Sequence, residues 1–536
     1  MKTIVRDQIQ EMLSTLWEGV NFARSQATTL QDSYQMLCDC YAVLQSVDSS
    51  LQSGLSEKRY AVYQVLTEKL FVLLEQLNGQ IQTRENTEKE AERIEALLHT
   101  AKEELIAEEE IEYDIVFLPY KAAMWDSLES IWRAAEEDPR CHAYVIPIPY
   151  YDRNPDFSFG KLHYEGDLFP EYVPITHYTK YNLLEKKPDV IYIHNPYDDY
   201  NRATSVHPAF YSDKLKNYTK KLVYVPYFIP GSYASVESAR DFCRAKGITN
   251  ADLVVAQSDV HKYLLVANGK PADQVAVLGN PKFDYVLNHL EDTEIPEEWK
   301  EKIGDKEAVL VCLGVSNYLK WSERGCVDVY DWLIDLLIHK YHKVVLYRPH
   351  PLLESTIQTM RSMERYVEYR NFLNKYLDTD NFILDTFPDA LPAIKVTKCM
   401  LSDYSSLCFS YMITGKPVGI MTFGHDEESF EKFYFALDYR TCYMIDIAFR
   451  LAWNFNRNNP DAFNAVLPNV LKKFPIKLGT LEEEERQIYQ YIDDTYIAKV
   501  VNETETKRNE RDEKRIKQLE NMSEKCGERI HSYILT

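Results

Sequence analysis

The sequence predicts an α/β protein in which two doubly wound domains follow a helical N-terminal region. No proline occurs before Pro119, and apolar residues recur at helical spacing in this first part of the chain. From Tyr113 onward, short β-branched runs alternate with helical segments, a pattern typical of βαβ units and parallel sheets. A polar, proline-containing stretch over 288–307 separates two such series, so we expect an interdomain connection there.

Residues 1–110 are predicted to form an antiparallel helical bundle or a coiled-coil arm. The helical spacing is carried by Ile9, Met12, Leu13, Leu16, Leu66, Leu70, Leu73, Leu74 and Leu77. We interpret Gly54 and Gly79 as turns between these helices. The charged run over 103–114 marks the end of the region. Homo-oligomerisation through the apolar stripes, or attachment near a membrane, is the function we expect of these helices.

The predicted strands fall into two groups, one in each α/β domain. In the first domain, over 111–295, we expect strands at 113–118, 143–148, 189–194, 221–227, 252–257 and 275–279. In the second domain, over 296–480, we expect strands at 308–314, 342–348, 381–385, 398–403 and 416–421. Two successive doubly wound sheets form a cleft at the carboxyl ends of their strands, where ligands bind. Residues 481–536 carry mixed charge at i,i+4 spacing and are predicted to form an exposed helix, with contact to the N-terminal helices or a partner as the alternative.

Composition excludes several classes of function. The formal charge of -22 argues against nucleic-acid binding, which needs a basic field. Glycine is scarce at 17 residues, and neither GxGxxG nor GxxxxGK[ST] occurs. The first residues lack the apolar segment of a signal peptide, and no run of about 18 apolar residues exists. We therefore expect a cytoplasmic protein. Its ten cysteines contain no CxxC pair and are interpreted as reduced structural thiols.

The strongest local signal for ligand binding lies in the run SDYSS at 402–406. A predicted strand delivers Asp403 to its carboxyl end, and Ser405 then stands as N-cap of the next helix, followed by Ser406. Free backbone N–H groups and two hydroxyls at such a helix start can bind phosphate. A plain helix cap, in which Asp403 bonds loop amides, explains the same residues equally well.

The second signal is the run RPHP at 348–351, which directly follows a predicted strand. The two prolines restrict the loop, so Arg348 and His350 are held at the strand end with little freedom. Such a pair can neutralise a diphosphate without a metal.

These motifs resemble the CDP-glycerol glycerophosphotransferases, which build teichoic-acid and related cell-envelope polymers. The resemblance rests on RPHP at 348–351, SDYSS at 402–406, GKPVGI at 415–420 and GNPKFD at 279–284. It spans roughly 113–470, is specific in the second domain and is vague before Gly279. The family has the GT-B fold, in which two Rossmann-like domains face each other, and this agrees with the two predicted series of strands.

The resemblance implies a transferase that moves glycerol phosphate from CDP-glycerol to an acceptor hydroxyl and releases CMP. It assigns Arg348 and His350 to the donor diphosphate, with His350 also a catalytic candidate. Ser405 and Ser406 would hold phosphate oxygens, and Asp403 would order the loop. No cofactor or metal is expected. The implied partners are CDP-glycerol or another CDP-alditol, and a lipid-linked or polymer acceptor at the inner face of the plasma membrane, where the protein would be peripherally associated.

The general base is left open, because the chain departs from the family in its first domain. Family members carry a His-Gly-Thr-Pro-like signature after a strand, where this chain has Pro226 and Tyr227. We expect His194 to replace that histidine, since it follows a strand and precedes two acidic residues. A structural His194 is the equal alternative. Asp198 could itself serve as the base, and His207 is a weaker candidate.

Two further patterns are interpreted as ordinary surface features. The only DxD, Asp378 to Asp380, precedes a strand and does not follow one, so we expect a solvated turn and no metal site. Four lysines form a basic cluster that is usually a solvated face, although it could contact anionic lipid: Lys214, Lys216, Lys220 and Lys221. A GT-B glycosyltransferase that uses a nucleotide sugar, or a non-catalytic scaffold, remains an alternative function for the chain as a whole.

Overall fold

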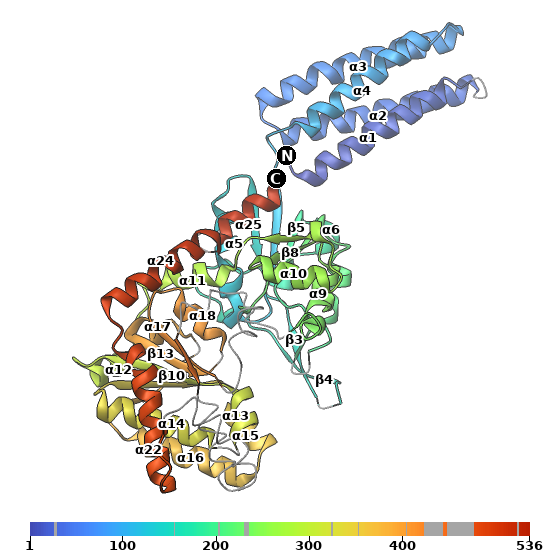
Figure 1. The fold of residues 1–536 in the computed structure, drawn as a ribbon. Helices are drawn as coiled ribbons and strands as arrows, with labels where there is room; N and C mark the ends of the chain where they lie inside the picture. The colour runs from blue at the N-terminus through green and yellow to red at the C-terminus, as the bar shows by residue number, and fades with distance from the viewer. Residues whose placement is uncertain are drawn as a thin grey trace.

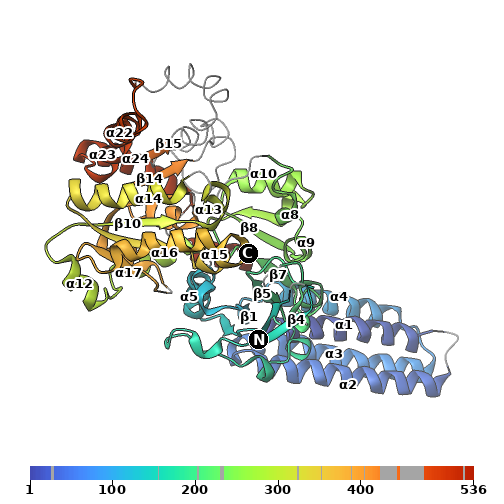
Figure 2. The same ribbon diagram turned by 90° about the horizontal axis from the view of Figure 1, so that it is seen from below.

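The chain consists of a helical arm, two α/β domains and a helical C-terminal segment (Figures 1 and 2). The computed structural model describes residues 1–25, 29–154, 156–201, 204–229, 235–322, 325–351, 353–387, 389–403, 405–422, 443–446, 476–522 and 525–536. Among these residues, no helix combines the length and the apolar character that crossing a membrane requires.

The arm contains the four long helices α1 (Thr3–Ala23), α2 (Leu30–Gly54), α3 (Glu57–Thr83) and α4 (Glu88–Ile106). Figure 1 shows it projecting away from the α/β domains. Leucine, isoleucine and valine side chains from all four helices form its buried core, which includes Leu16, Leu44 and Leu74. The helical prediction for this region is therefore confirmed, with one exception. Gly79 is not a turn, because α3 continues through it to Thr83; the turn after Gly54 is present.

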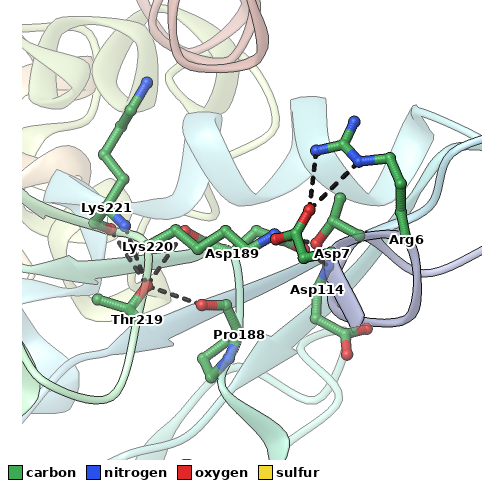
Figure 3. A network of polar contacts seen from close by, with 9 residues as sticks. Arg6, Asp7, Asp114, Pro188, Asp189, Thr219, Lys220 and Lys221 are labelled. Atoms are coloured by element: carbon green, nitrogen blue, oxygen red, sulfur yellow. Dashed lines mark hydrogen bonds and ion pairs between the residues drawn. The ribbon is translucent and has the colours of Figure 1, made fainter. Parts of the chain in front are cut away.

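A network of polar contacts fastens the base of the arm to the first sheet (Figure 3). Lys2 Nζ donates to both carboxylate oxygens of Asp114, at 2.9 and 2.7 Å. Lys220 forms ion pairs with Asp7 in α1 and with Asp189. These contacts join residues near the start of the chain to residues more than a hundred positions later.

The predicted basic cluster does not form a free basic surface. Lys220 belongs to the network of Figure 3, and Lys216 pairs with Asp252 at 3.3 Å. Lys214 donates to the carbonyl of Pro208 and Lys221 to that of Ile534, at 2.8 and 3.1 Å. The cluster therefore stabilises local structure and the attachment of both chain ends.

The first α/β domain is built on a six-stranded parallel sheet with the order β2-β1-β5-β7-β8-β9. Its strands are β1 (Tyr113–Leu118), β2 (Cys141–Val145), β5 (Val190–Ile193), β7 (Lys221–Tyr224), β8 (Leu253–Ala256) and β9 (Val275–Val277). Its helices are α5 (Glu129–Glu137), α6 (Leu183–Lys186), α7 (Ser212–Leu215), α8 (Arg240–Cys243), α9 (Lys246–Asn250), α10 (Asp259–Ala267) and α11 (Pro281–His289), and the 3-10 helix η1 (Ala122–Ser127) precedes α5. All six predicted strands are present. The strands β1, β5 and β8 are buried on both faces, as is typical of a parallel sheet, whereas the edge strand β2 is partly exposed.

A small antiparallel sheet in the first domain was not predicted from the sequence. It contains β3 (Tyr150–Arg153), β4 (Phe159–His163) and β6 (Thr204–Val206) in the order β4-β3-β6. The segments are short and polar, and β3 and β6 lie some fifty residues apart, so their pairing follows from tertiary structure and not from local pattern.

The second α/β domain repeats the architecture with the order β12-β11-β10-β13-β14-β15. Its strands are β10 (Ala308–Leu313), β11 (Val344–Pro349), β12 (Phe382–Leu384), β13 (Thr397–Asp403), β14 (Val418–Thr422) and β15 (Tyr443–Asp446). Its helices include α12 (Glu297–Ile303), α13 (Val315–Trp321), α14 (Cys326–Asp335), α15 (Leu353–Met360), α16 (Met363–Leu377), α17 (Leu391–Val396) and α18 (Ser406–Met412). The five predicted strands are present, and the fold is that of two Rossmann-like domains, as in the GT-B type. The order reverses between β10 and β13, where doubly wound sheets bind ligands.

The C-terminal segment is not the exposed helix that its charge pattern suggests. It forms α22 (Leu481–Ile492), α23 (Ala498–Val501), α24 (Glu505–Met522) and α25 (Cys526–Leu535). Ile488 and Ile492 enter the core of the second domain, whereas Cys526 and Ile530 enter that of the first. Figure 1 shows these helices running from the second domain back to the first. In the sequence, the charged residues of α24 dominate this segment, and the apolar faces of α22 and α25 were therefore not recognised.

Candidate functional site

A cavity of about 580 Å³ lies between the two α/β domains. The first domain supplies its wall mainly from η1 and the residues around Glu165, and the second supplies it from α17 and α18. Polar side chains that line it are Asp126, Glu165, Lys282, Tyr285, Asp389, Ser406 and Ser410. Its size is in the range of small-molecule sites, and it lies where the carboxyl ends of parallel strands lead into helices.

Asp126 and Lys282 form an ion pair at the wall of this cavity. Asp126 belongs to η1, which follows β1, and Lys282 lies in the first turn of α11. Asn280 caps that helix by accepting from the Lys282 N–H at 3.1 Å, and its amide donates to Gln257 at 2.9 Å. The backbone that carries Lys282 is therefore fixed. Burial raises the pKa of Asp126 above its usual range although Lys282 opposes the shift.

Ser405 and Ser406 lie at the start of α18, and Ser406 lines the cavity. Ser405 is the N-cap, and its hydroxyl accepts from the Leu407 N–H at 3.3 Å. Ser406 is exposed, so its hydroxyl can face a ligand. Tyr404, between Asp403 and Ser405, lies outside the described residues. The helix is only seven residues long. The two hydroxyls, more than the helix dipole, are therefore the groups of this segment that can bind a ligand.

Asp403 orders the switch point of the second sheet and does not face the cavity. Its carboxylate is fully buried and accepts from the Gly314 N–H, at 2.9 and 3.0 Å, and from the Asn317 side chain at 3.2 Å. A side chain at Gly314 would collide with it, since a Cβ there would lie 2.9 Å from a carboxylate oxygen. Desolvation raises the pKa of Asp403 to about 6. The carboxylate thus joins the ends of β10 and β13.

Arg348 and His350 line a separate cavity of about 260 Å³ at the end of β11. Arg348 Nη1 donates to the buried carboxylate of Asp385 at 2.7 Å, so this ion pair fixes the guanidinium. His350 is exposed at the surface, and partial burial lowers the pKa of its imidazole. Phe387 belongs to this cavity, and Asp389, two residues later, belongs to the interdomain one.

His194 occupies a closed site at the end of β5. Its side chain has no exposed surface, and its Nε2 accepts from the Tyr120 N–H at 3.2 Å. Its Nδ1 lies 3.0 Å from the hydroxyl of Ser127, so both ring nitrogens have partners. Burial, and to a lesser extent the charge of Lys282, lowers the pKa of His194 to about 3. This arrangement joins the ends of β1 and β5 and leaves no path for an acceptor hydroxyl to the ring.

Asp198 and His207 also bond their own loops. The Asp198 carboxylate is buried and accepts from the N–H and the hydroxyl of Ser212, at 3.0 and 2.6 Å. Burial raises the pKa of Asp198 to about 6. His207 caps a short 3-10 turn by accepting from the Ala209 N–H at 3.2 Å. Neither residue lines the interdomain cavity.

A cluster of possible metal ligands lies away from the cavity, where α25 meets the first domain. It contains Asp138, Cys141 and His531. Asp138 already accepts from Arg140 at 2.7 Å and lies 3.0 Å from the His531 imidazole. Burial raises the pKa of the Cys141 thiol to about 12, which keeps it protonated. These contacts fasten α25 to the edge of the first sheet.

Residues 246–441 match the family model of the CDP-Glycerol:Poly(glycerophosphate) glycerophosphotransferases. In this part, the chain is similar to that family. The protein is accordingly a transferase of the CDP-glycerol glycerophosphotransferase type. The match begins at α9 and includes Lys282, the RPHP loop and the SDYSS segment, so it is narrower than the range of 113–470 expected from the motifs.

No curated protein sequence matches the chain, and the solved structures that match it do so at low sequence identity. An S. aureus MnaA structure with UDP is 13% identical, with a TM-score of 0.43 over 79% of this chain and 96% of the other. UDP-GlcNAc 2-epimerase from Neisseria meningitidis is 12% identical, with a TM-score of 0.44 over 79% and 98%. A variant of the wall teichoic acid polymerase TagF is 14% identical, with a TM-score of 0.37 over 84% and 99%. These are distant similarities.

The sequence motifs identified the second-domain side of the cavity and missed the first-domain side. Ser406 was selected from the SDYSS run, and Lys282 stood in a quoted motif without an assigned role. Asp126 was overlooked because it lies in one of the helical segments between predicted strands and belongs to no motif. A break into η1 and then α5 places its carboxylate at the cavity. The only local signal was an acidic residue directly after Trp125.

Proposed function

We propose that the chain transfers glycerol phosphate, or a related alditol phosphate such as ribitol phosphate, from a CDP-linked donor to an acceptor hydroxyl. CMP is released, and the product extends or primes a teichoic-acid-like polymer of the cell envelope or capsule. The observation that carries the proposal is the position of the family-matched segment, which supplies Lys282 and Ser406 to a cavity of about 580 Å³ between the domains. A nucleotide-linked alditol phosphate fits a site of that size.

The reaction depends on hydrogen-bond donors and cations held in position more than on a covalent bond between the protein and the substrate. The acceptor oxygen attacks the phosphorus that bears glycerol, and the bond from that phosphorus to the bridging oxygen of CMP breaks. Charge on the phosphoryl oxygens is stabilised by fixed N–H and O–H groups and by cations. In this proposal Lys282 and the hydroxyl of Ser406 take that role in the cavity, and the hydroxyl of Ser405 assists from the N-cap of α18.

Arg348 and His350 are proposed to contact the nucleotide part of the donor from the neighbouring cavity. The Asp385 carboxylate orients Arg348. Since the pKa of His350 lies below the ordinary value, its imidazole is neutral at pH 7 and contributes an N–H donor without a full charge. Asp403 acts indirectly in this proposal, by holding the Gly314 loop at the switch point.

The acceptor is proposed to be lipid-linked or polymeric, which would bring a cytoplasmic protein to the inner face of the plasma membrane. The four lysines of the basic cluster have intramolecular partners, so we attribute this peripheral association to the acceptor. Salt-sensitive recovery of the protein with membranes, lost in cells that lack the acceptor, is the expected behaviour. Recovery that is independent of the acceptor would contradict this part of the proposal.

A ligand panel tests the proposed donor. CDP-glycerol, CDP-ribitol and UDP-sugars are each added to the purified protein, and the melting temperature is measured. A ligand at a hundred times its Kd stabilises the folded state by about 2.7 kcal/mol. Stabilisation by a CDP-alditol, reduced in Ser406→Ala and retained in the matched arm variant Ser53→Ala, supports the proposal. Stabilisation by UDP-sugars alone would favour a glycosyltransferase, and stabilisation by none would favour a scaffold.

A further inference from the structure

The Asp126 carboxylate has only one hydrogen-bond donor among the described residues. Its Oδ2 pairs with Lys282 Nζ, whereas its Oδ1 is shielded from solvent and has no partner. A buried oxygen left without a donor costs about 1 to 3 kcal/mol, so each such group calls for a physical explanation. Among the described residues, Lys282 is therefore the one donor that stabilises the charged form of Asp126.

Neighbouring carboxylates are bonded more completely. Glu129 accepts from the Tyr172 hydroxyl at 2.8 Å and from Arg133 at 2.8 Å, and it lies 2.9 Å from the His289 imidazole. Glu165, also at the cavity, accepts from the Ala122 N–H at 2.8 Å and from the Tyr150 hydroxyl at 2.6 Å. Each of these acids accepts from at least two groups, and the Arg133, Tyr150 and Tyr172 donors do not line the cavity. Asp126 differs because its one partner lines the cavity and can turn to another anion.

The charges that face Asp126 come from three sides. Lys282 of α11 is the cation that favours its ionised form. Asp389, before α17, and Glu129, in α5, are like charges that disfavour it, and Tyr285 also lines the cavity. Desolvation is the largest effect, and together with the two carboxylates it raises the pKa of Asp126. A carboxylate with a raised pKa is a stronger proton acceptor than an ordinary aspartate.

We infer that Asp126 is the proton acceptor of the transfer reaction, and that Lys282 stays paired with its carboxylate until the donor binds. The inference rests on the proposed function. The phosphates of the donor compete for Lys282, and its ammonium turns from Asp126 Oδ2 to a phosphate oxygen. The released carboxylate oxygen then takes the proton of the acceptor hydroxyl as that oxygen bonds to phosphorus. The electron pair of the broken P–O bond leaves with CMP, and the proton on Asp126 returns to solvent.

This assignment supplies the general base, which the sequence of the first domain leaves open. His194 cannot serve in the observed arrangement, because both ring nitrogens have partners and no atom of the side chain is exposed. The Asp198 carboxylate is bonded by Ser212 and lies away from the cavity. Asp126 has 23% of its side chain exposed, lines the cavity from the first domain and faces α18 residues of the second.

The test compares Asp126→Asn, Lys282→Met and the exposed control Asp305→Asn with wild type. CMP release from CDP-glycerol is followed from pH 5 to 9, with an alkyl glycerol phosphate as the soluble acceptor. Because the ionised carboxylate is the active form, wild-type turnover falls as pH decreases through the Asp126 pKa. Asp126→Asn should lose about 10²- to 10⁴-fold in kcat with little change in donor KM, and the acidic limb should disappear.

Lys282→Met should behave differently, and this keeps the inference testable even if the asparagine variant does not fold. Its donor KM should rise. The acidic limb of its kcat/KM, which reports the enzyme before the donor binds, should move to higher pH because the cation beside Asp126 is gone. Asp305→Asn should match wild type. Full turnover with an intact acidic limb in Asp126→Asn, or an unmoved limb in Lys282→Met, would overturn the inference. If wild type itself releases no CMP, the proposed function fails, and the two failures are thus distinguished.

Discussion

The Asp284 carboxylate accepts a hydrogen bond of 2.8 Å from the backbone N–H of Gly527, 243 residues later in the chain. It also accepts from the Cys526 N–H at 3.2 Å, so it caps the start of α25. Gly527 packs closely here, since a Cβ would meet the Ser130 backbone at 2.3 Å. Lys282 stands two residues before Asp284, and the same short motif therefore shapes the cavity wall and fastens the C-terminal helix to the first domain.

Replacing Asp284 with alanine should destabilise the docked tail. Two buried N–H groups would lose their acceptor, which costs about 2 to 4 kcal/mol in the free energy of unfolding. Urea unfolding measures this loss, and proteolysis between α24 and α25 should become faster. Asp305→Ala, at an exposed position, is the control. Equal stability of the two variants would show that the Asp284 cap does not hold α25.

Asp403 should give the protein a measurable pH dependence of stability. Its folded pKa of about 6 exceeds the ordinary aspartate value, so the folded state holds this proton more tightly than the unfolded state does. The stabilising contribution is complete below about pH 4 and is lost as pH rises through about 6. Wild type should therefore lose stability relative to Asp403→Asn across this window. Parallel stability curves for the two proteins would contradict a raised pKa at Asp403.

Arg348→Ala and His350→Ala should have different effects. Removing Arg348 leaves the buried Asp385 without its cation, which costs about 3 to 5 kcal/mol and should lower the melting temperature. His350 is exposed, so its removal should leave the fold intact and weaken donor binding by about one power of ten or less, the value of one neutral contact. Calorimetric titration with CDP-glycerol distinguishes these outcomes. Unchanged binding in a folded His350→Ala would remove the RPHP loop from the donor site.

Removal of the arm should leave donor binding intact. A chain that starts at Glu110 loses the contacts of Lys2 and Asp7 with the first domain but keeps both six-stranded sheets. We expect a lower melting temperature and an unchanged affinity for CDP-glycerol. A soluble shortened protein that no longer binds the donor would mean that the arm contributes to the site. Gel filtration of both forms also tests the prediction of oligomerisation through the arm.

The regular part of the fold could be predicted from the sequence because its signals are local. The runs at 113–118 and 308–313 are continuous apolar strands in the sequence and in the structure. The pairing of β3 with β6 and the return of α25 to the first domain depend on contacts between distant residues, and no local pattern contains them. The same limit applies to Gly79, where the helix-forming residues around it override a single glycine.

The candidate site also has features that the sequence predicts and features that it does not. Ser405, Ser406, Arg348 and His350 follow strands directly, so their approximate positions could be predicted from the βα pattern. The partners of these residues could not be predicted, although they decide the chemistry of the site. Asp385 pairs with Arg348, and the Gly314 N–H donates to Asp403. His194 follows a strand in the same manner, yet Tyr120 and Ser127 enclose it. Asp126 pairs with a residue 156 positions later, which the sequence alone does not reveal.

The most direct test of the account is to identify the nucleotide that the purified protein releases during turnover. The protein is incubated with CDP-glycerol and the soluble acceptor, and separately with nucleotide sugars, and the products are separated by ion-exchange chromatography. Transfer of glycerol phosphate with one CMP released for each unit added is the predicted result. Release of a nucleoside diphosphate from a nucleotide sugar, with CDP-glycerol left intact, would contradict it.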